Sequence, residues 1–217
     1  MSESATTESQ KLILYNSAGA RGLRVLWTIE ELGLDCDLRL LPFPPRTHAP
    51  AFREVNPLGT VPALVDGDVI MTESSAIAHY LATRYGPSDL AVSVEERDYP
   101  MFLDFLHYAD ATITFPQTVY LRFSVLEPNR GLEQAGALYA DWFSARLVKL
   151  EHRLADREFL CAERFTIADI AVTYALFLAD SVGLGERLPP RARAYRDRLA
   201  TRPALIRARA REKAGSA

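Results

Sequence analysis

The hydrophobic pattern of this 217-residue chain changes once, near residue 86. Before that point, short apolar runs of strand length alternate with stretches whose apolar residues recur every three or four positions. After it, only the helical spacing continues. A chain in this order can form a small mixed sheet covered by helices, followed by an all-helical part. We therefore predict an α/β domain joined to an all-α domain.

The first 41 residues predict a β-α-β unit. The apolar run KLILYN, from Lys11, has the length of a buried strand, and DCDLRLL that of a second one. Between them, apolar residues at helical spacing predict a helix that Gly33 ends in a left-handed cap, with Glu30 and Glu31 facing solvent. Because a helix connects the two strands, they should run parallel.

The next segment predicts a hairpin and a second helix. PFPPRTHAP carries four prolines among nine residues and predicts an extended loop, and AFREVN predicts a brief helical turn. The runs VPALV and VIM are joined through Asp66, Gly67 and Asp68, a strong hairpin signal. A helix then begins near Ser74 and ends by Gly86-Pro87.

These elements divide the chain into four predicted parts. Residues 1–10 are polar and read as a disordered tail, 11–86 as the first domain, 87–96 as a linker and 97–217 as the helical domain. Thr166 and Asp169 have the spacing of a capping box. The tail has no apolar core and no stretch approaches the roughly 20 apolar residues of a membrane span, so we expect a cytoplasmic protein without membrane contact.

Composition argues against several kinds of chemistry. Cys36 and Cys161 form no CxxC pair, which predicts buried, inert thiols and excludes a dithiol reductase. The four histidines lack metal-ligand spacing, so we expect no metal. Net charge is −3. Ten basic residues fall from Arg187 to Lys213, but at helical spacing and without an aromatic platform, which favours a solvated helix face over nucleic-acid binding.

Three motifs resemble the glutathione S-transferase family: RVLWTIEELGL at 24–34, NPLGTVPALVDGDVIMTESSAIAHYL at 56–81, and FTIADI at 165–170. The middle motif is the most specific. The resemblance, closest to the bacterial-type cytosolic members, covers residues 11–210. It implies a thioredoxin-like first domain, a C-terminal helical bundle, glutathione as cosubstrate, a role in detoxification and a homodimer.

Within the resemblance, Val61 and Pro62 are expected to bind the glutathione backbone. A cis bond at Val61-Pro62 would turn the Val61 amide and carbonyl outward, where the peptide could add as a short strand. The alternative is a trans proline that starts an edge strand.

The ends of glutathione require charged and polar partners. Ser74 at a helix N-terminus can receive the γ-glutamyl carboxylate while Glu73 takes the neighbouring ammonium; the alternative is a plain helix cap. His48 stands where relatives often carry a lysine or glutamine that contacts the glycyl carboxylate, and it is otherwise a surface histidine.

Activation of the glutathione thiol is the open question. A free thiol of pKa about 8.5 is mostly protonated at neutral pH, and each unit of lowering requires about 1.4 kcal/mol. The serine and cysteine classes place the donor at positions that correspond to residues 19–22, where this chain has no hydroxyl or thiol. We prefer Ser17 or Arg21, with Tyr15 and Asn16 as alternatives. The alternative for each of them is a plain turn or surface residue.

The electrophile pocket is expected from the first helices of the second domain. His107, Tyr108, Ala111 and Phe115 have the spacing of one helical face, and we name Tyr108 and Phe115 as substrate contacts, with a core role as the alternative. The predicted activity is addition of glutathione to small, mostly hydrophobic electrophiles. A ligand-binding protein without turnover, or a glutathione-dependent peroxidase, dehalogenase or isomerase, are the alternatives.

Overall fold

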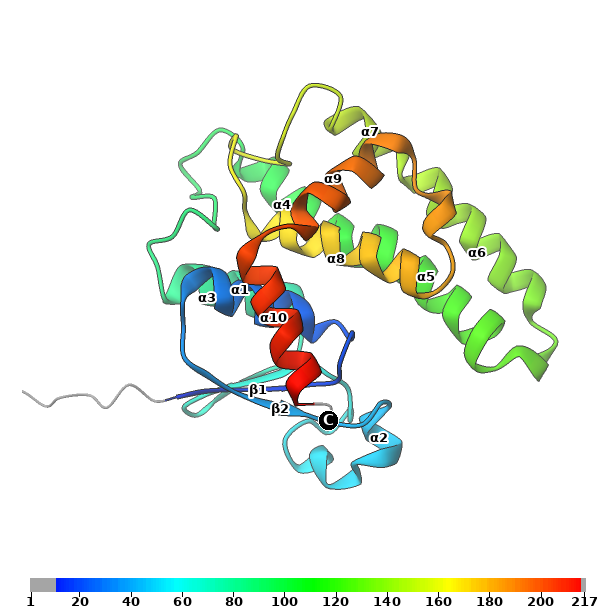
Figure 1. The fold of residues 1–217 in the computed structure, drawn as a ribbon, viewed down its shortest axis with the longest axis horizontal. Coiled ribbons are helices and arrows are strands. Elements are labelled where there is room, and N and C mark those ends of the chain that lie inside the picture. Colours follow the sequence, from blue (N-terminus) through cyan, green and yellow to red (C-terminus); the bar gives the residue numbers. More distant parts are fainter. Residues whose placement is uncertain (1–10, 216–217) are drawn as a thin grey trace, which may run out of the picture.

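The computed structural model describes residues 11–215 (Figure 1), so the predicted tail at 1–10 lies outside the described residues. In the described part, one four-stranded sheet has the order β2-β1-β3-β4. β1 pairs parallel with β2 and antiparallel with β3, and β3 pairs antiparallel with β4, which confirms the β-α-β unit and the hairpin. The strands are β1 (Leu12–Asn16), β2 (Cys36–Leu40), β3 (Ala63–Asp66) and β4 (Val69–Met71).

Two helices cover the face of this sheet that looks toward the helical domain (Figure 1). α1 (Gly22–Leu32) ends at Gly33, whose φ of 65° is the predicted left-handed cap. α3 (Ser74–Arg84) begins at the predicted serine. Both helices bury apolar residues against the strands, and the fully buried Trp27 is the largest side chain of this core.

The proline-rich segment after β2 is not an extended loop throughout. It contains a four-residue helix, α2 (Pro45–His48), followed by the 3₁₀ turn η1 (Pro50–Glu54), which is the turn that the sequence predicts. The prediction of an extended loop is wrong for α2 because a proline at the first helical position removes an N–H that has no partner there, and its fixed φ suits the helix.

From residue 99 onward the regular elements of the described chain are helices joined by turns and loops, with one isolated bridge between Cys161 and Arg164. The predicted capping box is present, since the Thr166 amide donates to the Asp169 carboxylate at 2.8 Å. The elements are α4 (Tyr99–His107), η2 (Tyr108–Thr114), α5 (Phe115–Tyr120), η3 (Leu121–Leu126), η4 (Pro128–Arg130), α6 (Glu133–Arg146), α7 (Val148–Arg153), α8 (Ile167–Ser181), η5 (Gly185–Arg187), α9 (Pro190–Ala200) and α10 (Pro203–Ala214).

The last helix returns to the first domain. Figure 1 shows α10 running beside α1 toward the sheet. Arg207 and Arg211 of α10 each bond the Glu30 carboxylate at 2.8 Å, and Arg202 bonds Glu31 at 2.7 and 2.9 Å. The expectation that Glu30 and Glu31 face solvent is therefore wrong: their side chains are 13% and 12% exposed, while that of Arg207 keeps 55%. The two acids face the arginines because α10 docks on α1, a contact between segments that are far apart in the chain.

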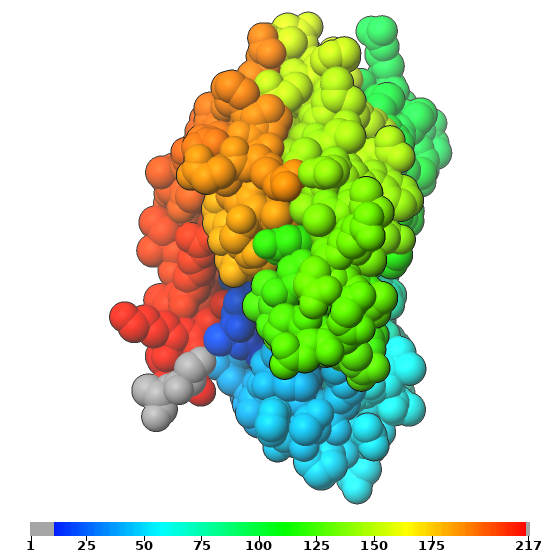
Figure 2. Space-filling model, turned by 90° about the vertical axis from the view of Figure 1, so that its right-hand side faces the viewer, coloured from blue at the N-terminus to red at the C-terminus, as the bar shows by residue number. Residues whose placement is uncertain are grey.

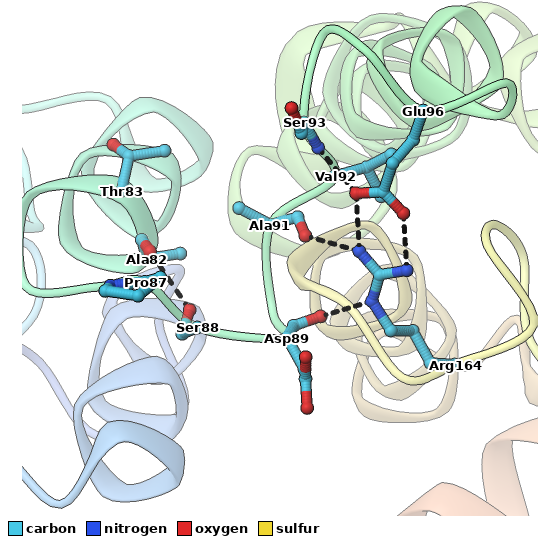
Figure 3. A pocket seen from close by; sticks show the side chains of 10 residues that line it. All are labelled: Ala82, Thr83, Pro87, Ser88, Asp89, Ala91, Val92, Ser93, Glu96 and Arg164. Atoms are coloured by element: carbon cyan, nitrogen blue, oxygen red, sulfur yellow. Dashed lines mark hydrogen bonds and ion pairs between the residues drawn. The ribbon is translucent and has the colours of Figure 1, made fainter.

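The segment between α3 and α4 is fastened by one arginine. The Arg164 guanidinium bonds both Glu96 carboxylate oxygens, at 2.6 and 2.8 Å, and the carbonyls of Asp89 and Ala91 at 3.0 and 2.9 Å (Figure 3). These groups line a hollow of about 750 Å³. Arg164 and Glu96 already pair with each other, so their charges are not available to a ligand. We therefore interpret this hollow as the junction between two parts of the chain and not as a binding site. The predicted boundaries of 86, 87 and 97 stay predictions.

Candidate functional site

Strand pairing brings three predicted site segments to one end of the sheet. β3 lies between β1 and β4, with Tyr15 opposite Ala63 and Leu64 opposite Met71. Because β3 runs antiparallel to both neighbours, the residues that follow β1, precede β3 and follow β4 meet at the same end. These residues are Ser17, Val61 and Pro62, and Glu73 and Ser74.

The peptide bond between Val61 and Pro62 is cis, as the sequence predicts. Pro62 is buried and Val61 is half-buried, so the chain reaches the surface immediately before β3. The contact of Val61 with a bound peptide stays a prediction.

Ser74 contacts a buried arginine, Arg24, that sequence analysis did not select. Ser74 is 4% exposed, and its hydroxyl accepts a hydrogen bond from Arg24 Nη1 at 3.1 Å. Because it serves as acceptor in this bond, its own proton remains free to be donated to an anion. The free amides of the first turn of α3 and the Arg24 charge add positive potential at the same place.

Arg24 has no exposed surface, and its charge is balanced by Asp110 from η2. Arg24 Nη1 bonds Asp110, Nη2 bonds the Thr114 hydroxyl at 3.1 Å, and the guanidinium lies 4.7 Å from the centroid of the Tyr174 ring. The Ser75 hydroxyl also donates to Asp110. These contacts connect α1 and α3 with the helical domain next to Ser74.

The ionisation of Asp110 follows from these contacts. Burial raises the pKa of Asp110, but the charge of Arg24 and the hydrogen bonds from Ser75 and Arg24 outweigh burial, and the pKa lies below its ordinary value. Asp110 is therefore a carboxylate at neutral pH. The only sign of this ion pair in the sequence was a single arginine, Arg24, among the apolar positions of α1. Its partner Asp110 lies 86 residues away, and no sequence pattern links the two.

Two of the four candidates for thiol activation have their polar groups engaged elsewhere. The Tyr15 hydroxyl accepts a bond from Arg39 Nη1 at 2.7 Å, and its ring lies 5.3 Å from that of Phe52. The buried Asn16 amide donates from Nδ2 to Glu212 Oε1 at 2.7 Å. Asn16 Nδ2 therefore already has one acceptor, whereas the Tyr15 hydroxyl is the acceptor in its bond with Arg39 and keeps its own proton for donation.

Ser17 and Arg21, the preferred candidates, differ in their contacts. The Ser17 side chain is 1% exposed, and within residues 11–215 its hydroxyl has no hydrogen-bond partner. Arg21 is half-buried at the start of α1 and donates to the Thr118 hydroxyl at 2.9 Å. Figure 2 shows this early, dark-blue part of the chain at the surface between the red C-terminal helix and the green helices.

The remaining predicted residues are spread over the surface and the core. Glu73 precedes α3 and is exposed, and so is His48 at the end of α2. Tyr108 and Phe115 do not share a face: Tyr108 is buried and donates to the Arg146 carbonyl at 2.8 Å, whereas Phe115 is 50% exposed. The reason is the π-helical stretch η2, whose wider turns shift the register between them. Burial gives Tyr108 a packing role and no support as a substrate contact.

Two broader features of the described residues bear on the chemistry. Across 11–215, no cluster of three or more histidine, cysteine, aspartate or glutamate side chains is arranged to hold a metal ion. No helix in this part of the chain combines the length and the apolar character needed to cross a membrane.

Both the sequence and the fold of this chain are similar to those of known proteins. Family models described as the N-terminal and C-terminal domains of glutathione S-transferase match residues 6–89 and 143–198. The chain is 32% identical to human glutathione S-transferase theta-2B over 181 residues, which is 77% of this chain and 71% of the relative. It is 29% identical to maize glutathione S-transferase 3, covering 84% of this chain and 86% of that one.

Solved structures agree with the sequence matches. Glutathione transferase URE2P6 from Phanerochaete chrysosporium, in complex with oxidized glutathione, superposes with a TM-score of 0.80 at 27% identity and covers 95% of this chain and 98% of that one. These relatives assign neither a class nor the bacterial type, which stays a prediction. The thioredoxin-like sheet domain, the helical domain and these matches together place the chain in the glutathione S-transferase family.

Proposed function

We propose that this protein is a glutathione transferase that binds glutathione, stabilises its thiolate and adds it to small, mostly hydrophobic electrophiles, in the manner of a detoxification enzyme. The observation that carries the proposal is the meeting of Val61-Pro62 and Glu73-Ser74 at one sheet end, over the buried Arg24. A peptide with a carboxylate and an amine at one end matches a buried hydroxyl and an exposed acid side by side.

In this arrangement each predicted residue has one task. The Val61 backbone pairs with the cysteinyl residue, Ser74 donates to the γ-glutamyl carboxylate, Glu73 takes the ammonium and His48 reaches the glycyl carboxylate. The thiol then lies at the start of α1, where Arg21 supplies charge and Ser17 a hydroxyl without a competing partner. No metal is required for this chemistry.

The test begins with binding. Glutathione is titrated into wild type, Ser74→Ala and the control Ser181→Ala, an exposed serine at the end of α8. Loss of a hydrogen bond to a charged carboxylate should weaken glutathione binding about 10- to 100-fold in Ser74→Ala, and leave Ser181→Ala unchanged. Equal affinity in all three proteins, or none in the wild type, contradicts the proposal.

Turnover separates this function from its rival. The enclosed Ser17 side chain and the absence of a hydroxyl at residues 19–22 favour a glutathione-binding protein without catalysis. Assay of the wild type, Ser17→Ala and Arg21→Gln against an aryl halide and a peroxide decides between them. If the conjugation rate falls in only one of the two variants, that residue is the activating group. If the wild type shows neither thiolate absorbance nor turnover, the protein binds glutathione without catalysis.

We further propose that the protein acts as a cytoplasmic homodimer. Two apolar side chains of the edge strand β4 support an interface, because Val69 and Ile70 are 46% and 51% exposed. Sedimentation of the full chain at several concentrations tests this assembly, and a monomer at all of them contradicts it.

A further inference from the structure

The C-terminal helix places a carboxylate against the loop between β1 and α1. Glu212 lies near the end of α10 and is 6% exposed. Its Oε1 accepts a hydrogen bond from Asn16 Nδ2 at 2.7 Å, and its Oε2 accepts one from the Gly19 amide at 3.2 Å. One carboxylate therefore binds both the residue before Ser17 and a residue in the middle of the loop.

Other contacts show that this position is built into the fold. The Glu30 and Glu31 carboxylates of α1 bind three arginines at the C-terminal end of the chain, which fixes α10 against α1. Gly22 leaves room for the Asn16 side chain, because a Cβ at that position would come within 2.2 Å of Asn16 Oδ1. The Asn16 amide is thus enclosed between α1 and Glu212.

A second helix of the helical domain, α8, binds the same loop. The Tyr174 hydroxyl of α8 donates to the Gly19 carbonyl at 3.2 Å, while Glu212 accepts from the Gly19 amide. Burial raises the pKa of Tyr174 to about 12, so this hydroxyl stays protonated. A glycine with φ of 73° has little intrinsic preference for its conformation, and these two contacts select it.

We propose that Glu212 is a positioning residue for thiol activation. By accepting from Asn16 and Gly19, it holds the loop that carries Ser17 and Arg21 in the one conformation in which their donors meet the glutathione sulfur. This inference rests on the proposed function. It makes α10, which contributes no predicted ligand contact, a required part of the site.

The test compares Glu212→Ala and Glu212→Gln with a matched control, Glu30→Gln. Glu30 binds Arg207 and Arg211 of the same helix but no residue of the loop. A general loosening of α10 would therefore appear in the control, and a specific effect on the loop would not. Glu212→Gln keeps one acceptor oxygen and should give an intermediate result.

The first measurement is hydrogen exchange of the Gly19 amide in the ligand-free full chain. Loss of the Glu212 acceptor should speed exchange roughly tenfold in Glu212→Ala, the factor expected for one hydrogen bond of ordinary net strength, and less in Glu212→Gln. Exchange in Glu30→Gln should match the wild type. Unchanged exchange in a folded Glu212→Ala, or equal acceleration in Glu30→Gln, overturns the inference.

The second measurement titrates the thiol of bound glutathione by its thiolate absorbance. In Glu212→Ala the thiol should ionise at higher pH, with roughly tenfold less thiolate at neutral pH, while glutathione affinity changes little. If the wild type binds no glutathione, the proposed function is contradicted, and the role of Glu212 in thiol activation is contradicted as well. If the wild type binds and Glu212→Ala ionises the thiol at the wild-type pH, only the role of Glu212 is overturned.

Discussion

Arg24 is the residue on which the site most depends, because a fully buried guanidinium is stable only while its charge is matched. Its partners Asp110 and Thr114 of η2 and Ser74 of α3 come from two elements that pack against α1. Desolvation of such an ion is costly, and the remaining partner is left uncompensated when one is removed. The residue that supports Ser74 therefore also joins the two parts of the chain.

We expect Arg24→Met to lower the free energy of unfolding by about 3 kcal/mol, since it strands Asp110. The control Arg207→Met removes an arginine whose side chain is 55% exposed, and because Arg211 still binds Glu30 the loss should be less than about 1 kcal/mol. The double variant Arg24→Met/Asp110→Leu should recover part of the loss. Urea unfolding measures all three, and an equal loss in the two single variants contradicts the assignment.

Low pH should remove the difference in stability between wild type and Arg24→Met. The folded-state pKa of Asp110 is depressed, so its stabilisation is fully present above the ordinary aspartate value of 3.8 and is lost as pH falls through the folded value. The stability gap between wild type and Arg24→Met should therefore narrow below that pH. A gap that stays constant down to strongly acidic pH would show that the charge of Asp110 is not its source.

At the scale of elements, one side chain fastens the segment between α3 and α4. Arg164 binds two carbonyls of that segment and the Glu96 carboxylate, and the bonds from Arg164 and from the Ser93 amide lower the pKa of Glu96 to about 2. A segment without helix or strand keeps its path only through such contacts. Arg164, next to the start of α8, thus holds this segment together with the Ile167 amide, which donates to the Leu90 carbonyl at 2.9 Å, and with the buried side chains of Leu90 and Val92.

Arg164→Ala should release this segment. We expect faster hydrogen exchange and new protease cleavage within residues 88–96, with exchange in α8 unchanged, and a Glu96 pKa that returns toward that of a free carboxyl. The control Arg187→Ala removes another exposed arginine pair, with Asp141. Cleavage that rises equally in both variants would assign the effect to general destabilisation.

At the scale of the molecule, the two cysteines lie on opposite sides of the junction that α1 shares with α8 and α10. Cys36 is in β2, and Cys161 precedes α8; both are buried, as predicted. Burial raises the pKa of Cys36 to about 11 and that of Cys161 to about 12. Neither thiol is a nucleophile at neutral pH while the chain is folded.

The shared Arg24–Asp110 and α1–α10 contacts predict that the sheet domain and the helical domain unfold together. In the single-cysteine variants Cys36→Ala and Cys161→Ala, alkylation of the remaining thiol at increasing urea should follow one common transition. Labelling of Cys36 at clearly lower urea than Cys161 would show that the sheet domain opens alone.

The sequence by itself determined the local elements. The βαβ unit, the Gly33 cap, the hairpin at Gly67, the start of α3 at Ser74 and the Thr166 capping box all follow from residues within a few positions of each other, where propensity and hydrogen bonding act locally. Only the tertiary structure decided the partners of Arg24, the loop contacts of Glu212, the inward turn of Glu30 and Glu31, and the separation of Tyr108 from Phe115. The physical reason is that a contact across 86 or 196 residues depends on how finished elements pack, and packing leaves no periodic signal in the chain.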